Sequence, residues 1–441
     1  MTTTLPRLRN PLDYMRPRVV RIGVTGLARA GKTVLLTTIA SLLLSPGALG
    51  GRLRSVRPAP LGAGNLPRFD GARHLASLAA DPPRWPERTN SLSLLALDLE
   101  LGDPMLPPRR VRLELLDYPG EWLLDLALLD QEFAPWSAAV LRRLEQPSLL
   151  PLTRDFLAFV RGLPASAAAD EALAESGHRL YRATLARLRD ERHLSTLQPG
   201  RFLMPAPGGS PPWEQFFPCP GTGGLVSLLG SRFAAYKQSV RDGLQSPMFG
   251  ALDRLAILAD LLGALHTGAE AYADAGLALS TVAASLHWRS SWLETASTLL
   301  RLHLPLPTIR RVAFVATKSD HVAERQRGNL AALMRSTARL PDDAPQARAF
   351  AIAAARCTED FVWTLDGRPV SAVRGRVLGE KTLTRSYPGE VPDQPPDASF
   401  WQHPFLELPR FEPARLPTGG SHIVPNLGVE ALLAFLLEDL L

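Results

Sequence analysis

The amino-acid sequence predicts an α/β fold, in which a sheet is covered by helices on both faces and an all-α domain is inserted into the chain. Residues 18–44 join a β-branched run to an apolar helical pattern through a glycine-rich turn. Residues 121–250 show helical patterns without strand-like runs. Further apolar runs that are typical of strands lie at 92–101, 110–116, 255–261, 310–316 and 349–355. Strands therefore flank the helical block on both sides, as an insertion requires.

The glycine-rich turn is a complete phosphate-binding loop. Residues 26–33 read GLARAGKT and match the pattern G-x-x-x-x-G-K-[ST] between a strand and a helix. The glycines let backbone amides form an anion nest, to which the following helix adds its positive end. We expect Lys32 to reach the β- and γ-phosphates of a nucleotide and the Thr33 hydroxyl to ligate magnesium. The predicted nucleotide contacts are Gly26, Ala28, Arg29, Ala30, Gly31, Lys32, Thr33 and Val34.

A second motif, D-x-x-G, follows the run at 110–116 and comprises Asp117 to Gly120. In phosphate-loop enzymes a carboxylate at such a strand end holds magnesium through water, and the glycine amide can bind the γ-phosphate. An ordinary strand-ending turn is the alternative. The position downstream of a phosphate loop favours the functional interpretation.

A third motif, TKSD, occupies residues 317–320 directly after the run at 310–316. It is a variant of the N-K-x-D pattern of guanine-nucleotide proteins. We expect the Asp320 carboxylate to accept from N1 and the exocyclic amine of guanine, which adenine cannot supply. The Lys318 stem would lie along the base.

The run at 349–355 leads into a turn that is a candidate for contacting the guanine base on the side opposite the TKSD motif. A backbone amide there would meet the base carbonyl, although a plain strand end fits the sequence equally well. The predicted residues of this base site are Thr317, Lys318, Asp320, Ala354, Ala355 and Arg356.

Composition limits the alternatives for a chain of 441 residues, of which 46% are hydrophobic. Cys219 and Cys357 are far apart, which supports neither a disulfide framework nor a zinc site. No signal peptide and no apolar stretch of roughly twenty residues is recognisable, so we expect a cytoplasmic protein. The net charge is +6, but the arginines are scattered, which argues against specific nucleic-acid binding. Two of the only four lysines, Lys32 and Lys318, lie in the nucleotide motifs.

The predicted nucleotide domain comprises residues 1–120 and 251–441, and the helical insertion 121–250. The stretch 45–89 is rich in Gly, Pro and Arg and favours only a short helix near 71–80. Residues 362–425 form an irregular, β-rich extension. Longer helices are expected at 122–144, 151–162, 170–192, 224–244, 269–303 and 429–441.

With these motifs the chain resembles the YcjX-like family, bacterial stress-associated proteins with a Ras-like nucleotide domain and a helical insertion. The resemblance covers nearly the full length. It rests on GLARAGKT at 26–33, WPERTNSLS at 85–93, LLDYPGEWLLDL at 115–126, LQPGRFLMP at 197–205, DRLAILADLLGALHTG at 253–268, RSSWL at 289–293, ATKSDHV at 316–322 and SYPGEVP at 386–392. It implies binding of GTP and GDP with Mg²⁺ and slow hydrolysis.

The resemblance also implies roles for individual residues. Thr89, with Ser91 as the second choice, would be the first-switch ligand of magnesium. Glu121 stands where a water-positioning glutamine would follow D-x-x-G, and its charge would repel the γ-phosphate. The predicted catalytic group is Lys32, Thr33, Thr89, Asp117, Gly120 and Glu121, with Thr33, Thr89 and Asp117 as metal ligands.

Three functional hypotheses follow. The first is a GTPase switch that changes the docking of the helical insertion, the expected surface for an unknown protein effector. The second is an ATPase or kinase with the same phosphate loop. The third is a non-catalytic nucleotide-binding scaffold with peripheral membrane contact through its arginines. The residues name neither the effector nor the oligomeric state.

Overall fold

The computed structural model describes residues 17–45, 47–61, 66–87, 92–102, 108–203, 210–245, 252–285, 309–341, 344–402, 408–416 and 423–440. Within these ranges a seven-stranded sheet has the order β2-β3-β4-β1-β5-β6-β7. Its strands are β1 (Arg18–Gly26), β2 (Leu53–Pro58), β3 (Ser93–Leu101), β4 (Arg109–Asp117), β5 (Arg254–Ala259), β6 (Arg311–Ala316) and β7 (Ala347–Ala351). β4, β1, β5, β6 and β7 are mutually parallel, whereas β3 is antiparallel to both β2 and β4.

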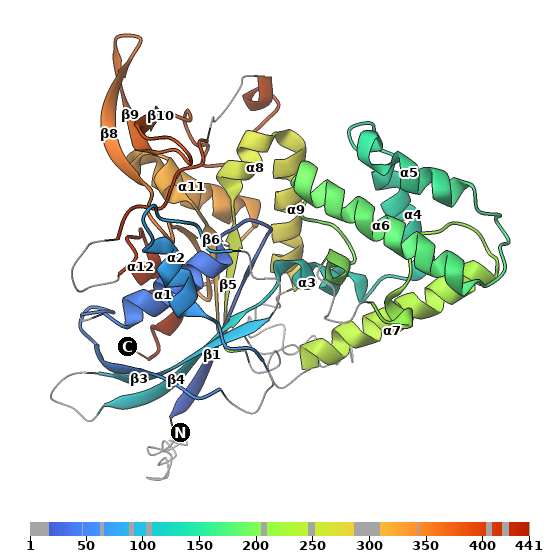
Figure 1. Ribbon diagram of the computed structural model, residues 1–441, viewed down its shortest axis with the longest axis horizontal. Helices are drawn as coiled ribbons and strands as arrows, with labels where there is room; N and C mark the ends of the chain where they lie inside the picture. The colour runs from blue at the N-terminus through green and yellow to red at the C-terminus, as the bar shows by residue number, and fades with distance from the viewer. Residues whose placement is uncertain are drawn as a thin grey trace, which may run out of the picture.

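Helices cover both faces of this sheet, which confirms the predicted fold class (Figure 1). The helices of this part of the chain are α1 (Lys32–Leu43), α2 (Gly71–Leu78), α8 (Leu261–Thr267), α9 (Ala269–Ser285), α11 (Glu324–Thr337) and α12 (Val429–Leu437). Alternate strand residues enter different cores. In β5, for example, Leu255 and Ile257 pack with α9 and α11, whereas Ala256 and Leu258 pack with α1 and α12.

Three details of the sequence prediction were wrong. The edge strand β2 was not expected, because its residues, LRSVRP, have no clear apolar alternation. The apolar run at 349–355 leaves the sheet already at Ala351. The helix expected at 122–144 is broken, because Pro135 has no amide to donate to the Gln131 carbonyl. Lys237 donates to that carbonyl over 2.6 Å instead.

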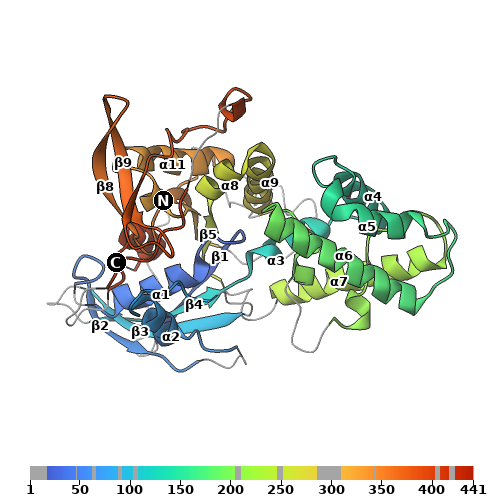
Figure 2. The same cartoon turned by 45° about the horizontal axis from the view of Figure 1, so that its top comes forward.

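The segment from 120 to 245 contains helices and 3₁₀ turns but no strand among its described residues. Its elements are α3 (Gly120–Leu124), η2 (Asp125–Leu128), α4 (Phe133–Leu144), α5 (Leu150–Arg161), α6 (Glu171–Glu191), η3 (Gly200–Leu203), η4 (Pro212–Glu214) and α7 (Gly224–Gln245). Figures 1 and 2 show α4 to α7 grouped beside the sheet. Their buried side chains are continuous with the core on one sheet face, so a separate inserted domain stays a prediction.

The β-rich extension contains a second sheet, with the antiparallel order β10-β9-β8. It comprises β8 (Thr358–Leu365), β9 (Arg368–Arg376) and β10 (Leu383–Ser386), and the 3₁₀ turn η6 (Phe400–Gln402) follows. None of the helices in the described ranges has the length and apolar character needed to cross a bilayer.

Candidate functional site

The phosphate-binding loop lies between β1 and α1, as the sequence predicts. Gly26 approaches β5 so closely that a β-carbon there would be 2.3 Å from the Leu258 carbonyl oxygen. The Leu27 amide donates to that same oxygen over 2.8 Å. Gly31, just before α1, has a φ of 80°, a left-handed conformation that strains any side chain. Glycine is therefore required at 26 by packing and at 31 by backbone conformation.

Lys32 and Thr33 are the first residues of α1. The Lys32 ammonium donates to the Gly26 carbonyl oxygen over 3.0 Å, so the side chain folds back across the loop. The carbonyl is a neutral acceptor, and phosphate oxygens bind an ammonium more strongly. A phosphate entering the loop would thus meet a cation that is already in place.

The D-x-x-G motif touches the loop directly. Asp117 ends β4, is 4% exposed, and is paired in register with Val24 of β1. Gly120 begins α3, and a β-carbon there would be 1.9 Å from the Gly26 carbonyl oxygen. Three predicted positions lie outside the described part of the chain: Thr89, Ser91 and the Glu121 side chain.

The TKSD motif follows β6 at the same edge of the sheet. Lys318 adopts a left-handed φ of 60°, and its ammonium forms an ion pair with Asp260, which follows β5. Asp320 is 1% exposed. Its Oδ2 accepts from the Cys357 amide over 2.7 Å and from the Cys357 thiol over 2.9 Å. Both functional side chains are thus held by residues that come from other strand ends.

The remaining predicted base-site residues lie around this motif. The Thr317 amide donates to the last carbonyl of β5 over 3.0 Å. The Ala354 carbonyl accepts from the Thr38 hydroxyl over 2.7 Å, which ties the turn after β7 to α1. The Arg356 guanidinium instead donates to the Thr358 carbonyl over 2.8 Å and borders a different cavity. The Arg356 amide donates to the Pro425 carbonyl over 2.6 Å. A contact between Arg356 and the base stays a prediction.

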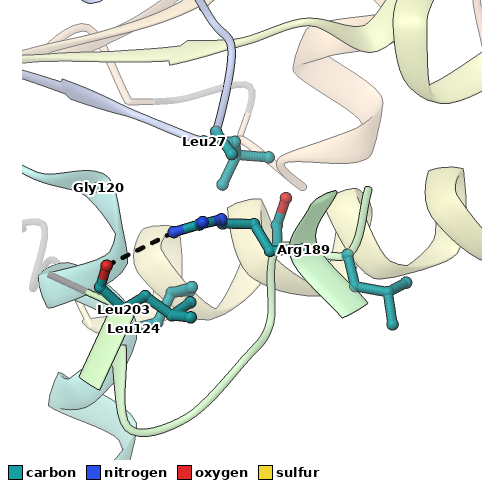
Figure 3. A pocket seen from close by; sticks show the side chains of 8 residues that line it. Leu27, Gly120, Leu124, Arg189 and Leu203 are labelled. Atoms are coloured by element: carbon teal, nitrogen blue, oxygen red, sulfur yellow. Dashed lines mark hydrogen bonds between the residues drawn. The ribbon is translucent and has the colours of Figure 1, made fainter. Parts of the chain in front are cut away.

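One cavity of about 610 Å³ joins the phosphate loop to the base site, a volume typical of small-molecule sites. The predicted residues that line it are Ala28, Arg29, Ala30, Gly31, Val34, Thr317, Lys318, Asp320, Ala354 and Ala355. A much smaller cavity of about 10 Å³ lies next to it, where Gly120 meets Leu27 and Ala28 (Figure 3). Arg189 of α6 lines both cavities.

The lining of the large cavity is rich in positive charge. Its cationic side chains are Arg29, Arg189, Arg410 and Lys318, against two carboxylates, Asp260 and Asp320. An anionic ligand with several charges suits this balance. Both carboxylates are close to the base end, and one of them is already paired with Lys318.

Several residues of the cavity were not identified from the sequence. Asp260 had a detectable signal, because it ends a strand at the same sheet edge as the motifs. Trp85 and Phe411 both line the cavity, and the Trp85 indole N–H donates a hydrogen bond to the Phe411 carbonyl over 2.9 Å. No local pattern identifies these two, or Cys357, as site residues, because long-range folding brings them together.

Arg29 connects the phosphate loop to the helical segment. Its guanidinium donates to the Asp190 carbonyl over 3.2 Å and contacts His193 Nε2 at 3.0 Å. Burial, followed by the positive charge of Arg29, lowers the pKa of His193. The neutral imidazole can then accept from the guanidinium. The loop and the end of α6 are therefore in direct polar contact.

A second connection is the fully buried Asp125, which lies just beyond α3. It accepts from the Tyr236 hydroxyl over 2.6 Å and from the Gly200 amide over 2.7 Å. Burial raises the pKa of Asp125 to about 6, partly offset by these hydrogen bonds. The side-chain Nε2 of Gln198 also donates to the Leu124 carbonyl over 2.8 Å. Hydrogen bonds thus connect the segment after D-x-x-G to the loop at 198–200.

Comparison with known proteins agrees with these features. The pattern of the YcjX-like family, DUF463, matches residues 20–441. The "Ras-like GTPase YcjX" of Escherichia coli (strain K12) is 31% identical, and the similarity covers 99% of both chains. The protein of the same name from Shewanella oneidensis is 27% identical over 96% of this chain and 94% of its own. The chain described here therefore belongs to the YcjX-like family.

Proposed function

We propose that this protein binds GTP and GDP together with Mg²⁺ and hydrolyses GTP slowly to GDP and phosphate. The observation that carries the proposal is the single cavity of about 610 Å³ that joins the phosphate loop to Lys318 and Asp320. Two family members that are named Ras-like GTPases support it.

Guanine would be selected at Asp320. The Cys357 amide and thiol hold one oxygen of this carboxylate, which lines the cavity. Guanine presents two adjacent N–H donors to a carboxylate, whereas adenine has an unprotonated N1 at the corresponding position. A buried site that is built to accept these hydrogen bonds rejects the base that cannot donate them. The aliphatic stem of Lys318 would support the ring.

The phosphates would be bound by the loop amides and by Lys32. Mg²⁺ is a hard cation that prefers oxygen ligands, which Thr33 and Asp117 supply. Both residues also lie at the phosphate loop, where the metal would meet the phosphates. Bound Mg²⁺ would neutralise charge on the β- and γ-phosphate oxygens. Gly120 lies against Gly26, and its amide would bind the γ-phosphate.

We propose slow hydrolysis because Glu121 follows Gly120 where a glutamine would orient water. Arg189 is the candidate for stabilising charge on the γ-phosphate, since it lines the small cavity beside Gly120 and Ala28. Arg189 also forms an ion pair with Asp190 over 3.0 Å, and Arg29 donates to the Asp190 carbonyl, so both arginines are held at the end of α6. Fast turnover that survives Glu121→Ala would contradict this account of hydrolysis.

The switch part of the proposal follows from the two connections to the helical segment. Loss of the γ-phosphate would release Gly120, and the contacts of Asp125 and Leu124 with the 198–200 loop would transmit the change. The helical segment is the proposed surface for a protein effector. We also propose a role in a bacterial stress response, which the resemblance to the YcjX-like family implies, and a cytoplasmic location.

Calorimetric titration of GDP and ADP, with and without Mg²⁺, tests the base preference. We expect GDP to bind roughly 100-fold or more tightly than ADP. Asp320→Ala should weaken GDP binding roughly 10- to 100-fold, whereas Asp130→Ala, at an exposed position, should not. ATP that displaced labelled GDP as well as GTP does would favour the ATPase alternative. Tight GDP binding without turnover, with salt-sensitive binding to liposomes, would favour the scaffold.

A further inference from the structure

Three potential metal ligands meet at the base end of the large cavity. Asp320 and His321 come from the 3₁₀ turn η5 (Ser319–His321), and Cys357 precedes β8. One donor atom of each lies within 4.8 Å of the other two. The Cys357 Sγ is 2.9 Å from Asp320 Oδ2 and 3.7 Å from His321 Nε2. All three residues line the cavity.

We propose that Asp320, His321 and Cys357 bind Zn²⁺. A thiolate, an imidazole and a carboxylate are the three ligand types that zinc uses in proteins, and a three-residue set leaves a fourth position open. The sequence did not predict this site, because its two cysteines are far apart. A site built from different segments cannot be recognised from cysteine spacing.

The distances agree with this assignment. Tetrahedral zinc with ordinary bond lengths places sulfur and imidazole nitrogen about 3.6 Å apart, and sulfur and carboxylate oxygen about as far apart. The sulfur-to-nitrogen distance of 3.7 Å already matches. The sulfur-to-oxygen distance of 2.9 Å is that of a hydrogen bond and must widen by about 0.7 Å when the metal replaces the thiol proton.

The hydrogen bonding of His321 is a second observation that points to an ion. His321 Nδ1 is buried and has no hydrogen-bond partner within the described residues. Among the described residues, its Nε2 contacts the weakly polar sulfur of Cys357 at 3.7 Å. Buried polar atoms without good partners are rare in folded proteins, and a bound ion or water is a common reason for them. Coordination at Nε2 would replace this weak contact with a strong bond, and Nδ1 would then carry the ring proton and donate it to an acceptor such as water.

The charges also balance. When the zinc–sulfur bond forms, the Cys357 thiol loses its proton to solvent, and the resulting thiolate and the Asp320 carboxylate together neutralise Zn²⁺. The nearby Lys318 ammonium is already paired with Asp260, which reduces its repulsion of the metal. Burial and the negative charge of Asp320 raise the pKa of the thiol, so the metal must compete with a firmly held proton.

Zinc would exclude guanine from the site, because both use the Asp320 carboxylate. This consequence rests on the proposed function, whereas the metal site itself does not. Zn²⁺ would then inhibit nucleotide binding at the base end while leaving the phosphate loop untouched.

The test is a titration of the metal-free full-length protein with Zn²⁺ in competition with a chromophoric chelator. We expect one equivalent to bind. Cys357→Ser should lower zinc affinity tenfold or more while its hydroxyl still donates to Asp320, and His321→Gln should act similarly. Cys219→Ser is the matched control and should retain binding. Co²⁺ should give a thiolate charge-transfer band that disappears in Cys357→Ser.

A labelled GDP measurement separates the two proposals. Zinc that binds with full dependence on Cys357, in a protein that binds no GDP, would support the metal site and reject the proposed function. Normal GDP binding together with zinc affinity that is the same in wild type, Cys357→Ser and His321→Gln would overturn the metal site. If both proposals hold, Zn²⁺ should displace GDP from wild type but not from His321→Gln.

Discussion

Gly120 lies against the Gly26 carbonyl so closely that a β-carbon would be 1.9 Å from the oxygen. The neighbouring atom is backbone, which cannot rotate away as a side chain could. Any side chain at 120 must therefore displace α3 from the phosphate loop.

Gly120→Ala should consequently destabilise the protein by about 1 to 3 kcal/mol, the usual cost of overpacking. Urea unfolding measures the change. Gly328→Ala is the matched control, since it lies within α11 and its β-carbon would meet nothing within 4 Å. That variant should be as stable as wild type or gain up to about 1 kcal/mol. Equal effects of the two substitutions would contradict the close contact at 120.

The carboxyl-terminal helix is anchored by Asp439, which accepts from the fully buried Arg254 of β5 over 2.5 Å. Asp439→Asn should cost about 1 to 3 kcal/mol, less than for a fully buried pair, because Asp439 is 31% exposed and Asp253 also faces Arg254. Glu438→Gln removes a more exposed pair with Arg311 and should cost at most about 1 kcal/mol. Chemical denaturation of both variants checks the difference, and a mild Asp439→Asn phenotype would show that Arg254 finds another partner.

Asp125 should make stability depend on pH in an unusual direction. Burial raises its pKa to about 6, so between about pH 4 and pH 6 the folded protein binds more protons than the unfolded chain. The contribution of this group to stability is complete below about pH 4 and is lost as pH rises through about 6. The difference between this pKa and the ordinary value of 3.8 corresponds to about 3 kcal/mol of folding free energy.

Asp125→Asn should remove this dependence, because an uncharged amide oxygen can still accept from Tyr236. The measurement is the free energy of unfolding of wild type minus that of the variant across pH 4 to 7. We expect the difference to fall as pH rises. A flat difference would mean that Asp125 stays ionised in the folded state.

Arg189→Ala should lower GTP turnover by roughly tenfold or more while GDP affinity changes little, because its proposed contact is with the γ-phosphate. Arg192→Ala is the control: its guanidinium donates to the Ser148 carbonyl over 2.9 Å on the exposed surface. Single-turnover kinetics with saturating GTP separate the chemical step from binding. Turnover that is unchanged in Arg189→Ala would leave the arginine a purely structural role with the Leu203 carbonyl.

The arrangement of the motifs could be predicted because parallel strands bring their carboxyl ends to one edge. Asp117 ends β4, whereas Asp260 and the TKSD motif directly follow β5 and β6, and the structure places all three around the phosphate loop. Apolar periodicity likewise predicted β1, α1 and the strands β3 and β4. These features depend on local sequence and on simple rules of sheet topology.

Other features depend on distant contacts that leave no local signal. Pro135 marks the break before α4 locally, but the residue that satisfies the freed Gln131 carbonyl is Lys237, which is 106 positions away. The Asp320 carboxylate is oriented by Cys357, which is 37 positions away. Nothing near either residue in the sequence reports such a partner, so the zinc site could be found only from the folded chain.

The contact of Arg29 with Asp190 and His193 has a thermodynamic consequence. If nucleotide binding alters this contact, it also alters the affinity of the end of α6 for a protein partner. By linkage, that partner must change the affinity for nucleotide by the same factor. A protein bound to the helical segment would in that case act as an exchange factor or as an inhibitor of release without touching the nucleotide. Whether the partner raises or lowers nucleotide affinity would depend on whether it strengthens or weakens the contact of Arg29 with Asp190 and His193.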